Sequence, residues 1–87
     1  MGSYSLQILR SAAKEIESAP RKDRERIIAR IATLSEDSRP AGTKKLAGRE
    51  AYRIRPGDYR IVYTVSDPDR IVEIARVARR SDVYRSS

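Results

Sequence analysis

The chain has 87 residues, enough for one domain with a thin hydrophobic core, and we expect a single domain over residues 1–87. It contains no cysteine and no histidine, which excludes disulfides, thiolate metal sites and nucleophile systems that depend on a histidine base, and we expect no metal and no cofactor. The formal net charge of +7 is carried mostly by arginine and favours a polyanionic partner or an acidic protein partner.

The first part of the chain predicts one strand followed by two helices. Residues 4–8 alternate apolar and polar side chains, which is typical of a half-buried strand. Ser11 offers an N-cap for a first helix, and Pro20 ends that helix and suits the first turn of the next. The second helix is predicted from about Arg21 to Ser35. Its expected apolar stripe comprises Ile27, Ile28, Ile31 and Leu34.

The segment YRIRPGDYRIVY, residues 52–63, predicts two short strands separated by a turn at Pro56-Gly57-Asp58. Because side chains alternate along a strand, the tyrosines and isoleucines should share one apolar face. The opposite face should then display the guanidinium groups of Arg53, Arg55 and Arg60, which suit a phosphate diester. On the hairpin alone, a merely solvated row of arginines is the favoured interpretation.

The last predicted strand, Ile71 to Arg79, has apolar residues on both faces, which is typical of a central strand. One predicted face carries Ile71, Ala75 and Val77, and the other carries Val72, Ile74 and Ala78. The expected fold is α+β: an N-terminal strand, an αα-hairpin, then a three-stranded antiparallel meander. We expect the helices to pack on one face of a four-stranded sheet.

Arginine and tyrosine concentrate in the second half of the chain, where they could provide chemistry without a metal. A phenol beside several guanidinium groups should have a lowered pKa, and the resulting tyrosinate could accept the proton of a ribose 2′-hydroxyl. Arginines nearby could hold the scissile phosphate and offset its developing charge. The alternative is that Tyr84 is simply a packing residue near the C-terminus.

The motifs KKLAG, YRIRPGDYRIVY and VARRSDVY together resemble the RelE branch of the RelE/ParE toxin superfamily, over nearly the whole chain. The resemblance implies a RelE-like fold and a type II toxin–antitoxin toxin. It also implies a metal-independent endoribonuclease that cleaves messenger RNA in the ribosomal A site, by 2′-hydroxyl attack on the adjacent phosphate, and so inhibits translation. The implied partners are a cognate antitoxin, the ribosome with its rRNA, and mRNA.

Matched position by position, the resemblance implies a catalytic set of Arg60, Arg80 and Tyr84. Arg60 would grip the scissile phosphate, Arg80 would steady the transition state, and Tyr84 would be the base. Arg53 and Arg55 match the family's basic pair, and they are expected to bind substrate together with Arg79. Many relatives carry His or Lys where this chain has Arg79, and an arginine is a poor proton donor, so its expected role is electrostatic.

Two other functions stay open. The ParE branch shares the fold, inhibits DNA gyrase by binding, and lacks the arginine–tyrosine set; a basic RNA-binding module would use the same arginines without cleavage. Retention of Arg60, Arg80 and Tyr84 favours the nuclease. No apolar run approaches the length of a signal sequence or membrane span, so we expect a cytoplasmic protein with no membrane partner.

Overall fold

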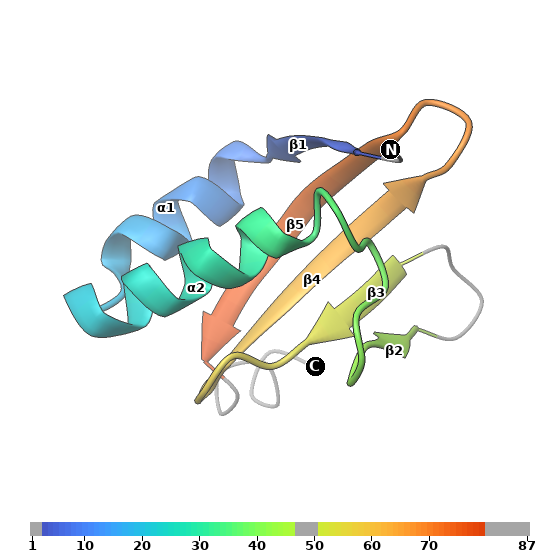
Figure 1. The fold of residues 1–87 in the computed structure, drawn as a ribbon. Helices are drawn as coiled ribbons and strands as arrows, with labels where there is room; N and C mark the ends of the chain where they lie inside the picture. Colours follow the sequence, from blue (N-terminus) through green and yellow to red (C-terminus); the bar gives the residue numbers. More distant parts are fainter. Residues whose placement is uncertain (1–2, 47–50, 80–87) are drawn as a thin grey trace.

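The computed structural model describes residues 3–46 and 51–79 (Figure 1). In chain order its elements are β1 (Ser5–Ile8), α1 (Arg10–Ser18), α2 (Arg21–Thr33), β2 (Lys44–Lys45), β3 (Ala51–Ile54), β4 (Tyr59–Ser66) and β5 (Ile71–Arg79). The strands form one sheet in the order β1-β5-β4-β3-β2. β3, β4 and β5 form the predicted antiparallel meander, and β1 pairs with β5 in parallel.

The prediction of a four-stranded sheet is wrong, because the sheet has five strands and is mixed. The additional strand is β2, in which Lys44 lies opposite Arg53 and Lys45 lies opposite Tyr52. Two residues are too few to show an alternating pattern, so the sequence offered no sign of this strand.

β1 was expected to be half-buried, but all four of its residues are exposed. Leu6 and Ile8 lie opposite Val72 and Ile74 and keep 36% and 45% of their surface exposed. The prediction failed because β1 lies at the edge of the sheet with β5 as its neighbour, so the apolar pattern marks a strand that the core covers poorly.

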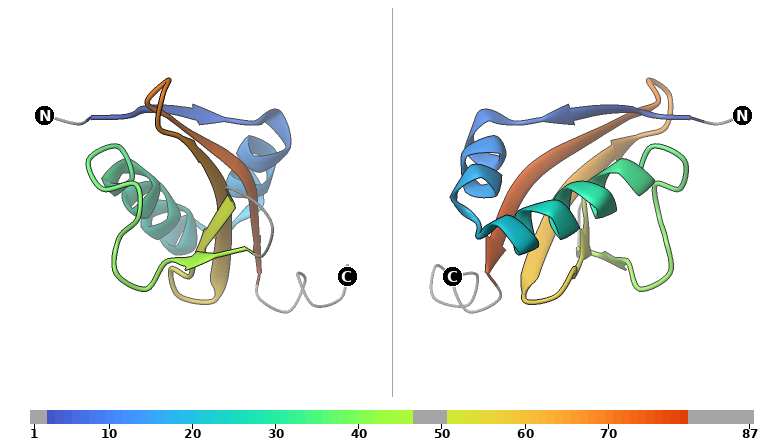
Figure 2. Two further views of the ribbon diagram at one scale, coloured as in Figure 1. Left: turned by 90° about the vertical axis from the view of Figure 1, so that its right-hand side faces the viewer. Right: turned by 60° about the vertical axis from the view of Figure 1, so that its left-hand side comes forward.

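The two helices meet the sheet in different ways (Figures 1 and 2). α2 crosses one face of the sheet over β4, whereas α1 continues from the end of β1 alongside β5. Leu9, not Ser11, is the residue that precedes the first turn of α1, and Pro20 precedes the first turn of α2. The proline joint between the helices is therefore close to its predicted place.

The core lies between the helices and the inward face of the meander. α1 contributes Ala12 and Ile16, and α2 contributes Ile27, Ile31 and Leu34. The predicted stripe was wrong for Ile28, which is 51% exposed. Successive residues of a helix are about 100° apart, so Ile28 turns away from a sheet that lies on one side of α2.

The predicted apolar face of the hairpin is confirmed. The buried residues that share this face are Tyr52, Ile54, Tyr59, Ile61, Tyr63 and Val65. The rings of Tyr52 and Tyr63 stack with centroids 5.8 Å apart. In the predicted turn, Gly57 has φ +65° and the N–H of Tyr59 donates to the carbonyl of Pro56, so the central residues are Gly57 and Asp58.

A β-bulge in β5 changes which of its side chains face the core. Val62 lies opposite Arg76, but the next residue, Tyr63, lies opposite Ile74, so Ala75 is an extra residue. Val77 consequently joins Val72 and Ile74 on the core face, and the predicted grouping of Val77 with Ile71 and Ala75 is wrong. A period of two cannot reveal an inserted residue, because the bulge breaks that period.

A polar network fixes the loop after α2 against one end of the sheet. The Arg39 guanidinium lies 4.9 Å from the centroid of the Tyr52 ring and pairs with the Asp67 carboxylate at 3.0 Å. The Tyr4 hydroxyl donates to the same carboxylate at 2.6 Å. The hydrogen bond from Arg39, and to a smaller extent that from Tyr4, lowers the pKa of Asp67. Burial raises the pKa of Tyr63, whose hydroxyl donates to the Ser38 carbonyl at 2.8 Å.

Two neighbouring residues of α2 should differ sharply in their contribution to stability. Ile27 is fully buried, so Ile27→Ala should lower the free energy of unfolding by about 2–5 kcal/mol through lost burial and a cavity. Ile28→Ala should change it by less than about 1 kcal/mol, because half of that side chain already contacts water. Urea denaturation of both variants measures the difference, and equal losses would show that Ile28 is a core residue after all.

Candidate nucleic-acid interface

The face of the sheet opposite α2 carries a group of cationic side chains. Strand register aligns Lys44 on β2 with Arg53 on β3, Arg53 with Val62 on β4, and Val62 with Arg76 on β5. Arg60 lies on the same face, two residues before Val62 on β4. We call this surface, made by Lys44, Arg53, Arg60 and Arg76, the basic face.

Arg60 is the buried member of the basic face. It lies opposite Ala78 on a strand that has neighbours on both sides, and only 5% of its surface is exposed. The prediction that it would be displayed like a surface arginine is therefore wrong. An arginine keeps its charge when buried, so this guanidinium is a positive charge held in place by the sheet.

The structure brings Arg53 and Arg60 together, as the hairpin pattern predicted. They occupy diagonal positions on adjacent strands, a relation that separates side chains by about 7–8 Å. Arg55 directly follows the end of β3 and is exposed. Two planar, permanently charged groups at this spacing suit the oxygens of a phosphate chain.

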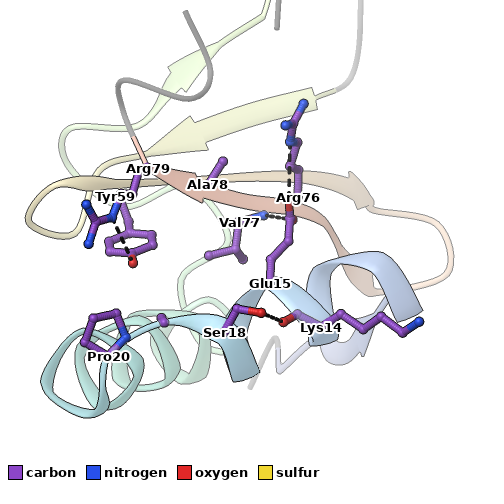
Figure 3. A pocket seen from close by; sticks show the side chains of 10 residues that line it. Lys14, Glu15, Ser18, Pro20, Tyr59, Arg76, Val77, Ala78 and Arg79 are labelled. Carbon is purple, nitrogen blue, oxygen red and sulfur yellow. Dashed lines mark hydrogen bonds and ion pairs between the residues drawn. The ribbon is translucent and has the colours of Figure 1, made fainter. Parts of the chain in front are cut away.

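Arg79 was expected to bind substrate beside these arginines, but the structure places it on the other face. It lies opposite Tyr59, whose side chain belongs to the core. Its guanidinium carbon is 6.0 Å from the centroid of the Tyr59 ring, and its Nε lies 3.5 Å from the Tyr59 hydroxyl (Figure 3). Arg80 and Tyr84, the other two predicted catalytic residues, lie outside the described residues.

Beside Arg79 there is a pocket of about 440 Å³ between α1, the joint before α2 and the end of β5 (Figure 3). Apolar atoms of Pro20, Tyr59 and Val77 line it, together with the charged side chains of Glu15 and Arg79. Figure 3 shows Glu15 reaching from α1 to the strand, where its carboxylate contacts both Arg76 and the main chain of Val77.

Sequence reasoning missed Glu15 and Lys44. Glu15 and Val77 are 62 residues apart in the chain, so no local pattern connects them. Lys44 joins the basic face through a strand of two residues, and its only sequence signal was membership of the KKLAG motif. Both positions depend on the completed sheet.

The described part of the chain can be compared with what a metal centre or a membrane span requires. Within residues 3–46 and 51–79, no three acidic side chains lie close enough to hold a metal ion. No helix among those residues is long and apolar enough to cross a membrane. What the basic face can do chemically is bind and neutralise phosphate groups.

Comparison with known proteins identifies relatives over almost the whole chain. Residues 6–84 match a family model described as the ParE toxin of the type II toxin–antitoxin system parDE. A Methanocaldococcus jannaschii protein named as a candidate toxin, RelE1, is 29% identical over 95% of this chain and 97% of its own length.

Two solved structures show the same fold at similar sequence identity. The RelE–RelB complex from Pyrococcus horikoshii OT3 superposes with a TM-score of 0.82 at 27% identity, covering 90% of this chain and 96% of that one. The isolated RelE toxin of E. coli superposes with a TM-score of 0.79 at 27% identity, covering 97% and 94% of the two chains.

Proposed function

The chain belongs to the RelE/ParE superfamily of type II toxin–antitoxin toxins, and from this premise we propose that it is a ribosome-dependent messenger-RNA endoribonuclease. The superfamily alone leaves two activities open, because the family model is described by its gyrase-targeting branch while the similar solved structures are RelE toxins. One fold can support several functions, so the choice between nuclease and gyrase inhibitor depends on the residues of the basic face.

The observation that carries the proposal is the buried Arg60 on the basic face. Arg60 keeps only 5% of its surface exposed, and burying a charged residue costs desolvation free energy that simple binding to a partner does not require. A positive charge fixed before substrate arrives can stabilise developing negative charge without reorganising. Arg60 therefore supports a catalytic role on phosphate better than a docking role on gyrase.

In the proposed reaction the ribose 2′-oxygen attacks the adjacent phosphorus and the bond from phosphorus to the 5′-oxygen breaks. Tyr84, in its tyrosinate form, accepts the 2′-hydroxyl proton, Arg60 binds the non-bridging phosphate oxygens, and Arg80 steadies the transition state. The departing 5′-oxygen takes up a proton from water. The upstream fragment ends in a 2′,3′-cyclic phosphate and the downstream fragment in a 5′-hydroxyl. No step needs a metal or another cofactor.

The remaining arginines bind the RNA on either side of the cut. Arg53 lies on the same face of the sheet as Arg60, and Arg55 is exposed just after β3, so both would hold neighbouring phosphates. Arg79 lies on the helix side at the end of β5, so we place its contact on a different phosphate from theirs. These phosphate contacts position the substrate without reading its sequence.

The proposed protein partner is a cognate antitoxin of acidic character. The E. coli and P. horikoshii relatives are known as complexes of RelE with RelB. A net charge of +7 favours an acidic partner that covers the basic face and blocks access of RNA. Exposed apolar side chains at Leu6, Ile8 and Ile28 offer additional surface for such a partner to bury.

Cleavage of a messenger on programmed ribosomes, run beside a gyrase supercoiling assay, tests the proposed activity. We expect cleavage in the A site, no effect on supercoiling, and activity that survives EDTA once enough magnesium is restored to keep ribosomes intact. The upstream fragment should carry a 2′,3′-cyclic phosphate. A 5′-phosphate on the downstream fragment would mean that water is the nucleophile. Inhibition of gyrase without cleavage would assign the chain to the ParE branch.

Substitutions should separate catalysis from binding. Tyr84→Phe removes only the phenolic proton acceptor, so the single-turnover rate should fall by at least about 100-fold while ribosome binding is unchanged. Arg53→Ala should instead weaken binding and reduce the slope of log affinity against log salt concentration by about 1. Arg70→Gln, which removes one positive charge at an exposed position in the turn before β5, is the control. A Tyr84→Phe variant that cuts at the wild-type rate would refute the tyrosine-base assignment.

A further inference from the structure

The second half of β5 has a main-chain edge that β1 does not cover. β1 pairs with β5 from Ser5 opposite Ile71 to Ile8 opposite Ile74, and α1 then begins at Arg10. The bulge at Ala75 follows immediately, and β5 continues for four more residues to Arg79. β4 pairs with this half of β5 on one side, from Val62 opposite Arg76 to Tyr59 opposite Arg79, so the outer edge is the one whose main-chain groups need other partners.

Glu15 of α1 supplies the partner for this edge (Figure 3). The N–H of Val77 donates to one carboxylate oxygen of Glu15 at 2.7 Å. The other oxygen lies 3.4 Å from Nε of Arg76. A hydrogen bond from a main-chain N–H to an ionised carboxylate is stronger than one between neutral groups, so it holds the strand firmly.

Arginines flank Val77 on β5, and because the main chain is continuous a shift of Val77 would also shift them. Arg76 precedes it on the basic face, and Arg79 follows it by two residues against the Tyr59 ring. The next residue in the chain is Arg80. A displacement of about 1 Å in a group that contacts the reacting atoms can lower a rate about 100-fold.

We propose that Glu15 is a positioning residue for the arginines at the end of β5, acting through the main chain of Val77. The inference rests on the proposed nuclease function. The contact with Arg76 is secondary, because the two side chains are 47% and 31% exposed and an ion pair in contact with water contributes little. An amide oxygen can still accept the Val77 N–H, although more weakly than a carboxylate oxygen, whereas alanine cannot.

Two variants of Glu15 and one control test this role. Glu15→Ala removes the acceptor, and Glu15→Gln keeps an acceptor while losing the charge. Glu17→Gln, at an exposed position of the same helix, changes the net charge by the same amount without touching β5. Each variant is assayed for single-turnover cleavage across a range of ribosome concentrations, and for hydrogen exchange of the Val77 amide in the free protein.

We expect Glu15→Ala to lower the maximal cleavage rate at least about tenfold, with the half-saturating ribosome concentration changed by less than about threefold. The Val77 amide should exchange at least about tenfold faster in the same variant. Glu15→Gln should restore both quantities to within about threefold of the wild type, and Glu17→Gln should leave both unchanged. If the effect of Glu15→Ala came only from the lost charge, Glu15→Gln would show the same effect and no rescue.

Three results would overturn the proposal. Fast exchange in Glu15→Ala with an unchanged cleavage rate would show that the contact exists but positions nothing. Equal loss of cleavage in Glu15→Ala and Glu15→Gln would show that the charge of Glu15, not its hydrogen bond, matters. An unchanged exchange rate of the Val77 amide in both variants would show that Glu15 does not hold this amide. Failure of the wild-type chain to cleave would refute the proposed function and with it the catalytic part of this inference, whereas the exchange measurement would still decide whether Glu15 holds the strand.

Discussion

The pairing of β4 with β5, interrupted by one extra residue at Ala75, is the constraint on which the rest of the structure depends. Side chains alternate along a strand, so an inserted residue exchanges the two faces for everything that follows it. Without the bulge, Val77 would leave the core and Arg76 would enter it. With the bulge, Val72, Ile74 and Val77 all face the helices, and Arg76 joins the basic face.

The two faces of the β3–β4 pair carry different groups of side chains. On the core side, Arg39 joins Tyr52 and Asp67 in a network that attaches the loop after α2 to the sheet. On the opposite face, β3 and β4 carry Arg53 and Arg60. A strand positions a charged group more accurately than a loop does, which suits the proposed action of these arginines on phosphate.

The sequence predicted the parts of this structure that follow from local pattern. Alternation from Tyr52 to Val65 correctly indicated the meander and placed Arg53 and Arg60 on one face. It could not indicate β2, the bulge at Ala75 or the hydrogen bond between Glu15 and Val77, because each depends on pairing between distant segments. The exposure of Ile28 and the placement of Arg79 opposite Tyr59 likewise follow from packing. The roles of Arg80 and Tyr84 came from family resemblance and stay predictions.

The central claim is that the arginines and Tyr84 form a catalyst that depends on the ribosome to align its substrate. The chain has no histidine, and a phenol has an ordinary pKa of about 10, so its base is weak at neutral pH. Alignment of the 2′-hydroxyl with its phosphate can contribute about 7–11 kcal/mol. The direct test compares single-turnover cleavage of one messenger, free in solution and in a programmed A site, at equal saturation with the protein. The account predicts a ribosome-bound rate at least about 1,000-fold higher, and rates within about tenfold, equivalent to about 1.4 kcal/mol of ribosomal contribution, would contradict it.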